Sequence, residues 1–274
     1  MIPAAFDYEL ATSADHAVEL LVEHGDDAKV LAGGHSLIPL MKYRLAAPAV
    51  VVDVGRLVDL SYVREDGEHL AIGALTRHRD VETHELVAAN AGLLAEATRH
   101  VGDPQVRHRG TIGGALAHGD PASDIPAALL ALRGTLVIQG PSGTREVDID
   151  DFFTGFLETA LGPDELLTEV RIPRVPNAAW SFQKFNRRAQ DWAIVGAAVL
   201  VGDGSCGVGL VNMDSRPVRA GAVEAAVAAG SGAVDAAESA ADGLEPPADL
   251  NASSEYRCHL ARVLTRRGLE EAGC

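Results

Sequence analysis

Apolar residues in the first part of the chain recur with two spacings, which predicts a mixture of helices and strands. Ala17, Val18, Leu20 and Leu21 share one face of an amphipathic helix that ends near His24. Short apolar runs bounded by Gly, Pro or Asp are typical of buried strands. These runs predict strands at residues 29–32, 48–54, 70–74, 135–139 and 166–172, with 145–149 as a hairpin partner. Helices are predicted at residues 79–90, 93–100 and 122–132.

The pattern changes after Pro176. Residues 182–186, 194–201 and 206–211 predict a strand meander with a turn at 202–205, and three Ala-rich segments then predict helices at 220–229, 233–241 and 254–267. We therefore expect an α+β chain with a domain over residues 1–176, in two subdomains of about 1–56 and 57–176. A small C-terminal domain of residues 177–274, with an antiparallel sheet and helices, is expected to follow.

Composition narrows the classes of function. The formal net charge of −16 disfavours binding to nucleic-acid phosphates. No run approaches the ~18 consecutive apolar residues of a membrane span, and the first residues lack the basic region of a secretory signal. We expect a cytoplasmic protein.

Cysteine usage argues against a metal or cluster held by this chain. Cys206, Cys258 and Cys274 are far apart and form no C-x-x-C pair, and the ten histidines show no H-x-x-x-H or H-E-x-x-H spacing. We predict no metal site and no catalytic residue here. We expect the histidines to be surface or hydrogen-bonded residues, except for His35 and His118, which are candidate site residues.

Two glycine pairs carry the candidate chemistry. Gly33-Gly34 follows a predicted strand, and Gly113-Gly114 stands in a second Gly-rich segment. Glycine permits positive φ and lets successive backbone N–H groups face one anion. Hydroxyls of Ser36 and Thr111, and the ring of His35, could add donors, which suits a pyrophosphate. Each pair is also an ordinary turn signal, and neither matches the Rossmann or Walker A spacing.

The flanks of these glycine pairs resemble a known family. AGGHSLIP at residues 32–39 and TIGGALAHGDPASD at 111–124 resemble the two FAD-binding motifs of molybdenum hydroxylase flavoprotein subunits, the carbon monoxide dehydrogenase and xanthine dehydrogenase family. Further matches follow in family order at residues 165–170, 184–193, 212–220 and 254–261.

The resemblance implies a fold, a cofactor and partners. It implies a vanillyl-alcohol-oxidase (PCMH) type FAD-binding domain followed by a C-terminal domain of the carbon monoxide dehydrogenase flavoprotein type. FAD would pass electrons from two [2Fe-2S] clusters on a small subunit to an external acceptor. A large subunit would hold the molybdenum cofactor, and the assembly would be a dimer of heterotrimers. The lack of cluster-binding cysteines in this chain agrees with clusters on a partner.

The resemblance also implies which residues contact FAD. They are Ala32, Gly33, Gly34, His35, Ser36, Leu37, Thr111, Gly113, Gly114, Ala115, His118, Asp124, Leu167, Lys184 and Trp192. Asp124 would lie towards the adenosine, and Leu167 and Lys184 close to the flavin ring, where a lysine would favour an anionic reduced flavin. Alternatively, Lys184 is a solvated strand lysine. Trp192 either packs near the isoalloxazine or is a core aromatic.

Ala115 departs from the family pattern, which has Asn or Ser at this position. The loss of one neutral hydrogen bond would weaken FAD binding by about 0.5–1.5 kcal/mol. Two other functions stay open. A stand-alone flavin oxidoreductase would need an acid or base near the flavin, for which His118 is a weak candidate. A flavin-less assembly module would fit the change at Ala115.

Overall fold

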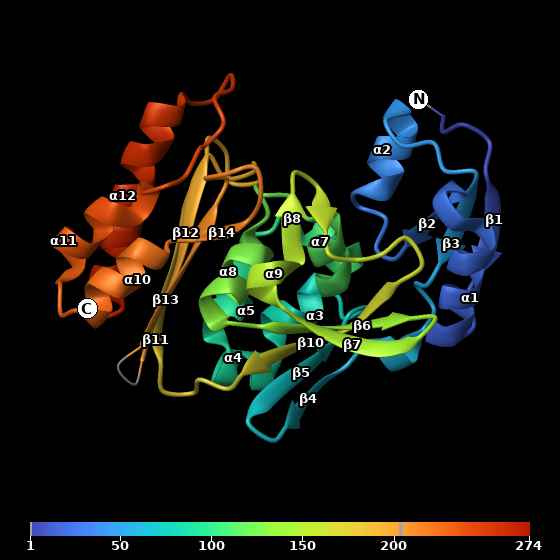
Figure 1. Cartoon of the computed structure of the whole chain (residues 1–274), viewed down its shortest axis with the longest axis horizontal. Helices are drawn as coiled ribbons and strands as arrows, with labels where there is room; N and C mark the ends of the chain where they lie inside the picture. The colour runs from blue at the N-terminus through green and yellow to red at the C-terminus, as the bar shows by residue number, and fades with distance from the viewer. Residues whose placement is uncertain (1, 203–204) are drawn as a thin grey trace.

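The computed structural model describes residues 2–202 and 205–274. Three blocks follow one another along the molecule (Figure 1): a small N-terminal sheet with α1 and α2, a central sheet with a cluster of helices, and a C-terminal sheet covered by α10, α11 and α12. Mixed helices and antiparallel sheets confirm the predicted fold class. Asp203 and Gly204, in the middle of the predicted turn at 202–205, lie outside the described residues.

The N-terminal block is a parallel three-stranded sheet in the order β1-β3-β2. The predicted helix has Ser13 as its cap, whose hydroxyl accepts a hydrogen bond from the N–H of His16 at 3.0 Å. The apolar segment after the first glycine pair forms a short helix. The elements are β1 (Asp7–Leu10), α1 (Ala14–His24), η1 (Gly25–Asp27), β2 (Ala28–Leu31), α2 (Leu37–Tyr43), β3 (Val50–Asp53) and η2 (Val58–Leu60).

The central block is built on an antiparallel five-stranded sheet in the order β4-β5-β10-β6-β7. Its strands are β4 (Val63–Asp66), β5 (His69–Gly73), β6 (Thr135–Gly140), β7 (Gly143–Asp148) and β10 (Leu166–Pro173). Its helices are α3 (His78–Thr83), α4 (Glu85–Asn90), α5 (Gly92–Arg99), α6 (Pro104–Arg109), α7 (Ile112–His118), α8 (Asp124–Leu132) and α9 (Ile149–Phe152). A two-stranded hairpin completes it, with β8 (Phe153–Gly155) and β9 (Glu158–Thr159).

The single helix predicted over residues 79–90 is wrong. His84 adopts an extended conformation, with φ −73° and ψ 128°, and its ring accepts from the N–H of Leu86, so the segment divides into α3 and α4. The sequence pattern also failed to predict β4, α6, α7 and the β8–β9 hairpin. These elements are short, and polar or glycine-rich residues interrupt their apolar periodicity.

The C-terminal sheet has the order β11-β12-β13-β14 and lies between two sets of helices. One face packs on α8, so close that a Cβ on Gly209 would lie 1.9 Å from the carbonyl oxygen of Ala127, and α12 covers the other. The elements are β11 (Ala179–Phe185), β12 (Val195–Gly202), β13 (Ser205–Val211), β14 (Val218–Arg219), α10 (Gly221–Ala228), α11 (Ala233–Ala237), η3 (Glu238–Ala241) and α12 (Ser254–Glu271). One apolar core thus extends across residue 176, and the domain boundary there stays a prediction.

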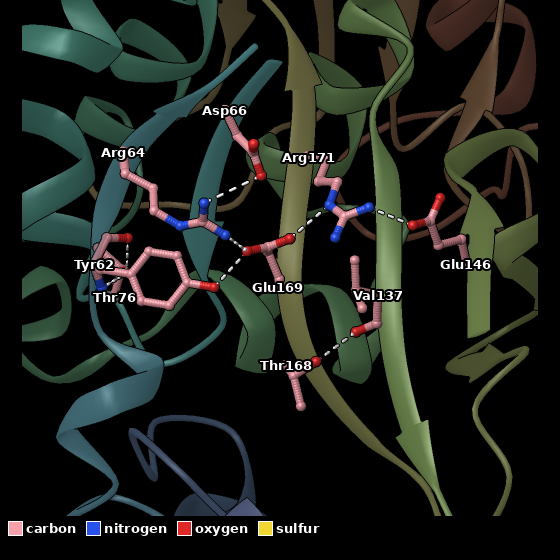
Figure 2. Close-up of polar contacts among 9 residues, drawn as sticks. All are labelled: Tyr62, Arg64, Asp66, Thr76, Val137, Glu146, Thr168, Glu169 and Arg171. Carbon is pink, nitrogen blue, oxygen red and sulfur yellow. Dashed lines mark hydrogen bonds and ion pairs between the residues drawn. The ribbon is translucent and has the colours of Figure 1, made fainter. Parts of the chain in front are cut away.

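A polar network ties β10 to β4, which lies on the far side of β5 in the sheet, and to Tyr62 just before β4. Buried Glu169 accepts from the hydroxyl of Tyr62 and from the guanidinium groups of Arg64 and Arg171 (Figure 2). Burial opposes ionisation of Glu169, but the hydrogen bonds from Tyr62 and Arg171 lower its pKa overall. The register against β6 shifts next to this anchor, between Leu167 and Glu169. The network therefore holds the irregular stretch of β10 that presents Leu167.

Candidate functional site

One cavity of about 500 Å³ lies where the N-terminal and central blocks meet the start of the C-terminal sheet. All fifteen residues predicted to contact FAD line it. They come from the β2–α2 loop, α7, the start of α8, β10, β11 and the β11–β12 loop. The volume lies within the roughly 300–1,000 Å³ of ligand pockets.

The first glycine loop presents unused backbone donors. None of the hydrogen bonds among the described residues engages the N–H groups of Gly33, Gly34, His35 or Ser36. Gly34 has φ +77°, a conformation that glycine adopts without strain, and a Cβ there would lie 2.7 Å from Ile38. The ring of His35 instead contacts the carbonyl of Gly33, with Nδ1 3.1 Å from that oxygen. This loop has the donors that an anion such as a pyrophosphate requires.

The second glycine pair does not form the nest that we expected. Thr111 caps α7, and its hydroxyl accepts from the N–H of Gly114 at 3.1 Å, while the N–H of Gly113 donates to the carbonyl of Ala74 at 2.8 Å. The N–H groups of Ile112 and Ala115 are also bonded within the protein. The prediction of an amide nest here was therefore wrong, because helix α7 and its packing use these donors.

Close packing explains one glycine of each pair, Gly113 and Gly33. A Cβ on Gly113 would lie 2.6 Å from the Cβ of Ala74, and a Cβ on Gly33 would lie 2.3 Å from the carbonyl oxygen of Arg109. These are distances that carbon atoms do not adopt without a shift of the backbone. The absence of side chains lets the two glycine segments approach one another and form one wall of the cavity.

A buried histidine supports this wall, and sequence reasoning did not single it out. Burial lowers the pKa of His78 to about 4, so the ring is neutral, and Nε2 donates to the carbonyl of Thr111 at 2.9 Å. Its Nδ1 has no partner among the described residues, and the residue lines the cavity. The apolar lining residues Val101 and Val106 were missed as well. No motif marks any of the three.

Lys184 and Asp124 form a buried ion pair in the cavity. Their charged atoms lie 2.7 Å apart, and the side chains are 4% and 5% exposed. Lys184 also donates to the carbonyl of His100 at 3.0 Å. The alternative of a solvated strand lysine is therefore wrong. Burial raises the pKa of Asp124 to about 6, although the charge of Lys184 acts in the opposite direction.

The second carboxylate oxygen of Asp124, Oδ1, is buried and has no hydrogen-bond partner among the described residues. A buried acceptor of this kind is costly unless a ligand or water satisfies it. Because the residue lines the cavity, the unpaired oxygen is suited to a hydroxyl donor of a bound molecule, such as a ribityl or ribose hydroxyl.

Leu167 and Trp192 add apolar side chains to the lining of the cavity. Leu167 is 5% exposed and Trp192 is 60% exposed, so the alternative of Trp192 as a core aromatic is wrong. Half-buried Ala115 and His118 also line this space, where Ala115 offers no side-chain donor or acceptor. Apolar side chains together with a loop of free amides suit a planar ring system and a pyrophosphate, and FAD contains both, with the pyrophosphate between its flavin and adenosine parts.

Comparison with known proteins identifies the family. The family described as "FAD binding domain in molybdopterin dehydrogenase" matches residues 4–175, and "CO dehydrogenase flavoprotein C-terminal domain" matches residues 180–272. The chain belongs to the FAD-binding medium subunits of the molybdenum hydroxylase family. It is accordingly an FAD-binding component of an oxidoreductase, as the motifs predicted.

Similar members of the family cover almost the whole chain. The carbon monoxide dehydrogenase medium chain of Hydrogenophaga pseudoflava is 37% identical, covering 99% of this chain and 98% of its own. That of Afipia carboxidovorans is 39% identical over the same shares. The solved carbon monoxide dehydrogenase of Hydrogenophaga pseudoflava superposes with a TM-score of 0.94 at 39% identity, covering 99% of this chain and 98% of that one.

Two further observations concern the predicted absences. None of the helices in the described ranges is long and apolar enough to cross a membrane. Residues 2–202 and 205–274 contain no group of three or more His, Cys, Asp or Glu side chains placed to hold a metal ion.

Proposed function

We propose that this chain is the electron-transferring subunit of a multi-subunit molybdenum hydroxylase. In this proposal it takes electrons from [2Fe-2S] clusters on a small partner subunit and delivers them to an external acceptor, while a large partner subunit carries the molybdenum cofactor. A cytoplasmic dimer of heterotrimers is the assembly that we propose. The observation that carries the proposal is the gathering of all fifteen predicted FAD contacts around one cavity.

The chain's own residues would bind and orient FAD, which supplies a carrier for one or two electrons. The free amides of Gly33, Gly34, His35 and Ser36 would hold the pyrophosphate, and Asp124 Oδ1 would accept from a hydroxyl of the cofactor. Leu167 and Trp192 would bound the ring. Lys184 would place a positive charge in the FAD site, and the carboxylate of Asp124 would accompany it, because the two side chains form an ion pair.

A deflavinated complex tests the proposal. The chain is assembled with its neighbouring subunits, its FAD is removed, and substrate is added. We expect the partner's metal centres to become reduced while reduction of the external acceptor falls at least a hundredfold, and added FAD to restore it. Unchanged acceptor reduction without FAD would contradict the proposal. Oxidation of an organic donor by this chain alone would support a stand-alone flavin oxidoreductase instead.

A further inference from the structure

A second cavity, of about 280 Å³, adjoins the first glycine loop, and its arginine side chains have no part in the proposed function. Gly33 and Gly34 line both cavities. The remaining polar lining comes from Asp53 at the end of β3, Arg56 after that strand, Arg77 before α3 and Arg109 at the end of α6. Three arginines at one hollow are unusual in a chain whose formal net charge is −16.

These three arginines have no carboxylate partner. None of the ion pairs among the described residues involves Arg56, Arg77 or Arg109. Asp53 also lines the cavity, but its two oxygens already accept from the hydroxyl of Tyr8 at 2.6 Å and from a backbone N–H at 2.7 Å. Positive charge therefore exceeds negative charge at this hollow.

The most buried of the three guanidinium groups is held in place. Arg77 is half-buried and donates to the carbonyl of Arg109, the same oxygen that approaches Gly33. Burial and the nearby charge of Arg109 lower the pKa of Arg77, while Asp80 and Asp53 act in the opposite direction. An anion between the arginines would compensate this desolvation and repulsion.

We propose that Arg56, Arg77 and Arg109 form a binding site for a small phosphate-type oxyanion, separate from the site of the FAD pyrophosphate. Guanidinium groups suit such an anion because their donors match two of its oxygens at once. The cavity is large enough for a phosphate group carried on a small freely diffusing molecule. Arg77 would bind directly and would also connect the anion to the loop that holds FAD.

Binding of inorganic phosphate to the full chain tests this site. Isothermal titration is run on the FAD-loaded chain at constant ionic strength, with chloride replacing phosphate in the reference. We expect one saturable site per chain. Arg56→Gln and Arg77→Gln should each weaken phosphate binding at least tenfold, and Arg56→Gln, at an exposed position, should leave the fold intact. Arg266→Gln is the matched control, because it removes one exposed positive charge from α12.

Three results would overturn the proposal. The first is binding of phosphate that does not saturate. This result would mean that the three arginines form a general cationic surface, suited to an acidic partner protein. The second is equal phosphate affinity in Arg56→Gln and in Arg266→Gln. The third is phosphate binding to the FAD-free chain that disappears in proportion to added FAD, which would mean that the anion occupies the pyrophosphate site.

Discussion

The ammonium group of Lys184 lies 2.7 Å from a carboxylate oxygen of Asp124, and both side chains are almost completely buried in the FAD cavity. The two residues come from β11 and from the start of α8, so the pair joins the C-terminal sheet to the central block. A buried pair is costly to break, because the remaining charge has no partner. This pair therefore serves the structure as well as the site.

Removal of one partner should destabilise the protein. Lys184→Met leaves Asp124 as a buried carboxylate, and we expect a loss of about 3–5 kcal/mol in the free energy of unfolding. The double change to Lys184→Met and Asp124→Asn should recover much of this loss. Urea unfolding measures both. Arg266→Gln, at an exposed pair with Glu270, should cost under about 1 kcal/mol. Equal effects of Lys184→Met and Arg266→Gln would contradict the structural role.

The stability of the chain should depend on pH through Asp124. Its pKa is about 6 in the folded protein, against an ordinary value of 3.8, so between these values the folded state binds more protons than the unfolded state. The stabilising contribution is therefore complete below about pH 3.8 and is lost as the pH rises through 6, a change of up to about 3 kcal/mol.

Urea unfolding of the wild-type chain and of Asp124→Asn at pH 4, 5, 6 and 7 measures this dependence. The stability of the wild type relative to the variant should fall over this range. A difference that is constant with pH would show that Asp124 has an ordinary pKa.

Close approach of the two glycine segments should be required for FAD binding. Gly33→Ala places a Cβ 2.3 Å from the carbonyl oxygen of Arg109 and must push the segments apart, so we expect FAD affinity to fall at least tenfold. Quenching of flavin fluorescence measures the affinity. Gly221→Ala is the matched control, because a Cβ there meets no atom within 4 Å. Wild-type affinity in Gly33→Ala would refute the packing account.

A polar side chain at position 115 should strengthen FAD binding. Ala115→Ser adds one hydroxyl to the cavity lining, and a neutral hydrogen bond contributes about 0.5–1.5 kcal/mol, which is roughly a 2- to 10-fold gain in affinity. The same fluorescence titration measures it, with Ala222→Ser on the exposed side of α10 as the control. No gain would mean that the position 115 side chain does not reach the cofactor.

The sequence predicted the site better than it predicted the local structure around it. The fifteen residues that the motifs predicted all line the cavity, because the glycine pairs and the other motif segments are local signals. The amide of Gly114 bonds to the nearby helix cap Thr111, but the engaged amide of Gly113 was not predictable, since its acceptor lies on Ala74, far away in the sequence. The ion pair of Lys184 with Asp124 was not predictable for the same reason, because the two residues are sixty positions apart in the sequence.

Apolar and neutral members of the site escaped sequence reasoning altogether. Val101 and Val106 carry no chemical signature, and they enter the cavity only because the chain turns between α5 and α6. His78 looks like any surface histidine in the sequence, yet tertiary packing buries it beneath Thr111. Tertiary contacts rather than local propensity decide such positions.

The order of reduction in the assembled complex tests the central claim most directly. The complete complex is mixed anaerobically with its substrate in a stopped-flow instrument, and the visible bands of the clusters and of the flavin are followed together. The account predicts that the clusters are reduced first, that the flavin of this chain follows, and that in Gly33→Ala only the second phase decreases, in proportion to the FAD that the complex has lost. Reduction of the external acceptor without any change in the flavin band would contradict the account.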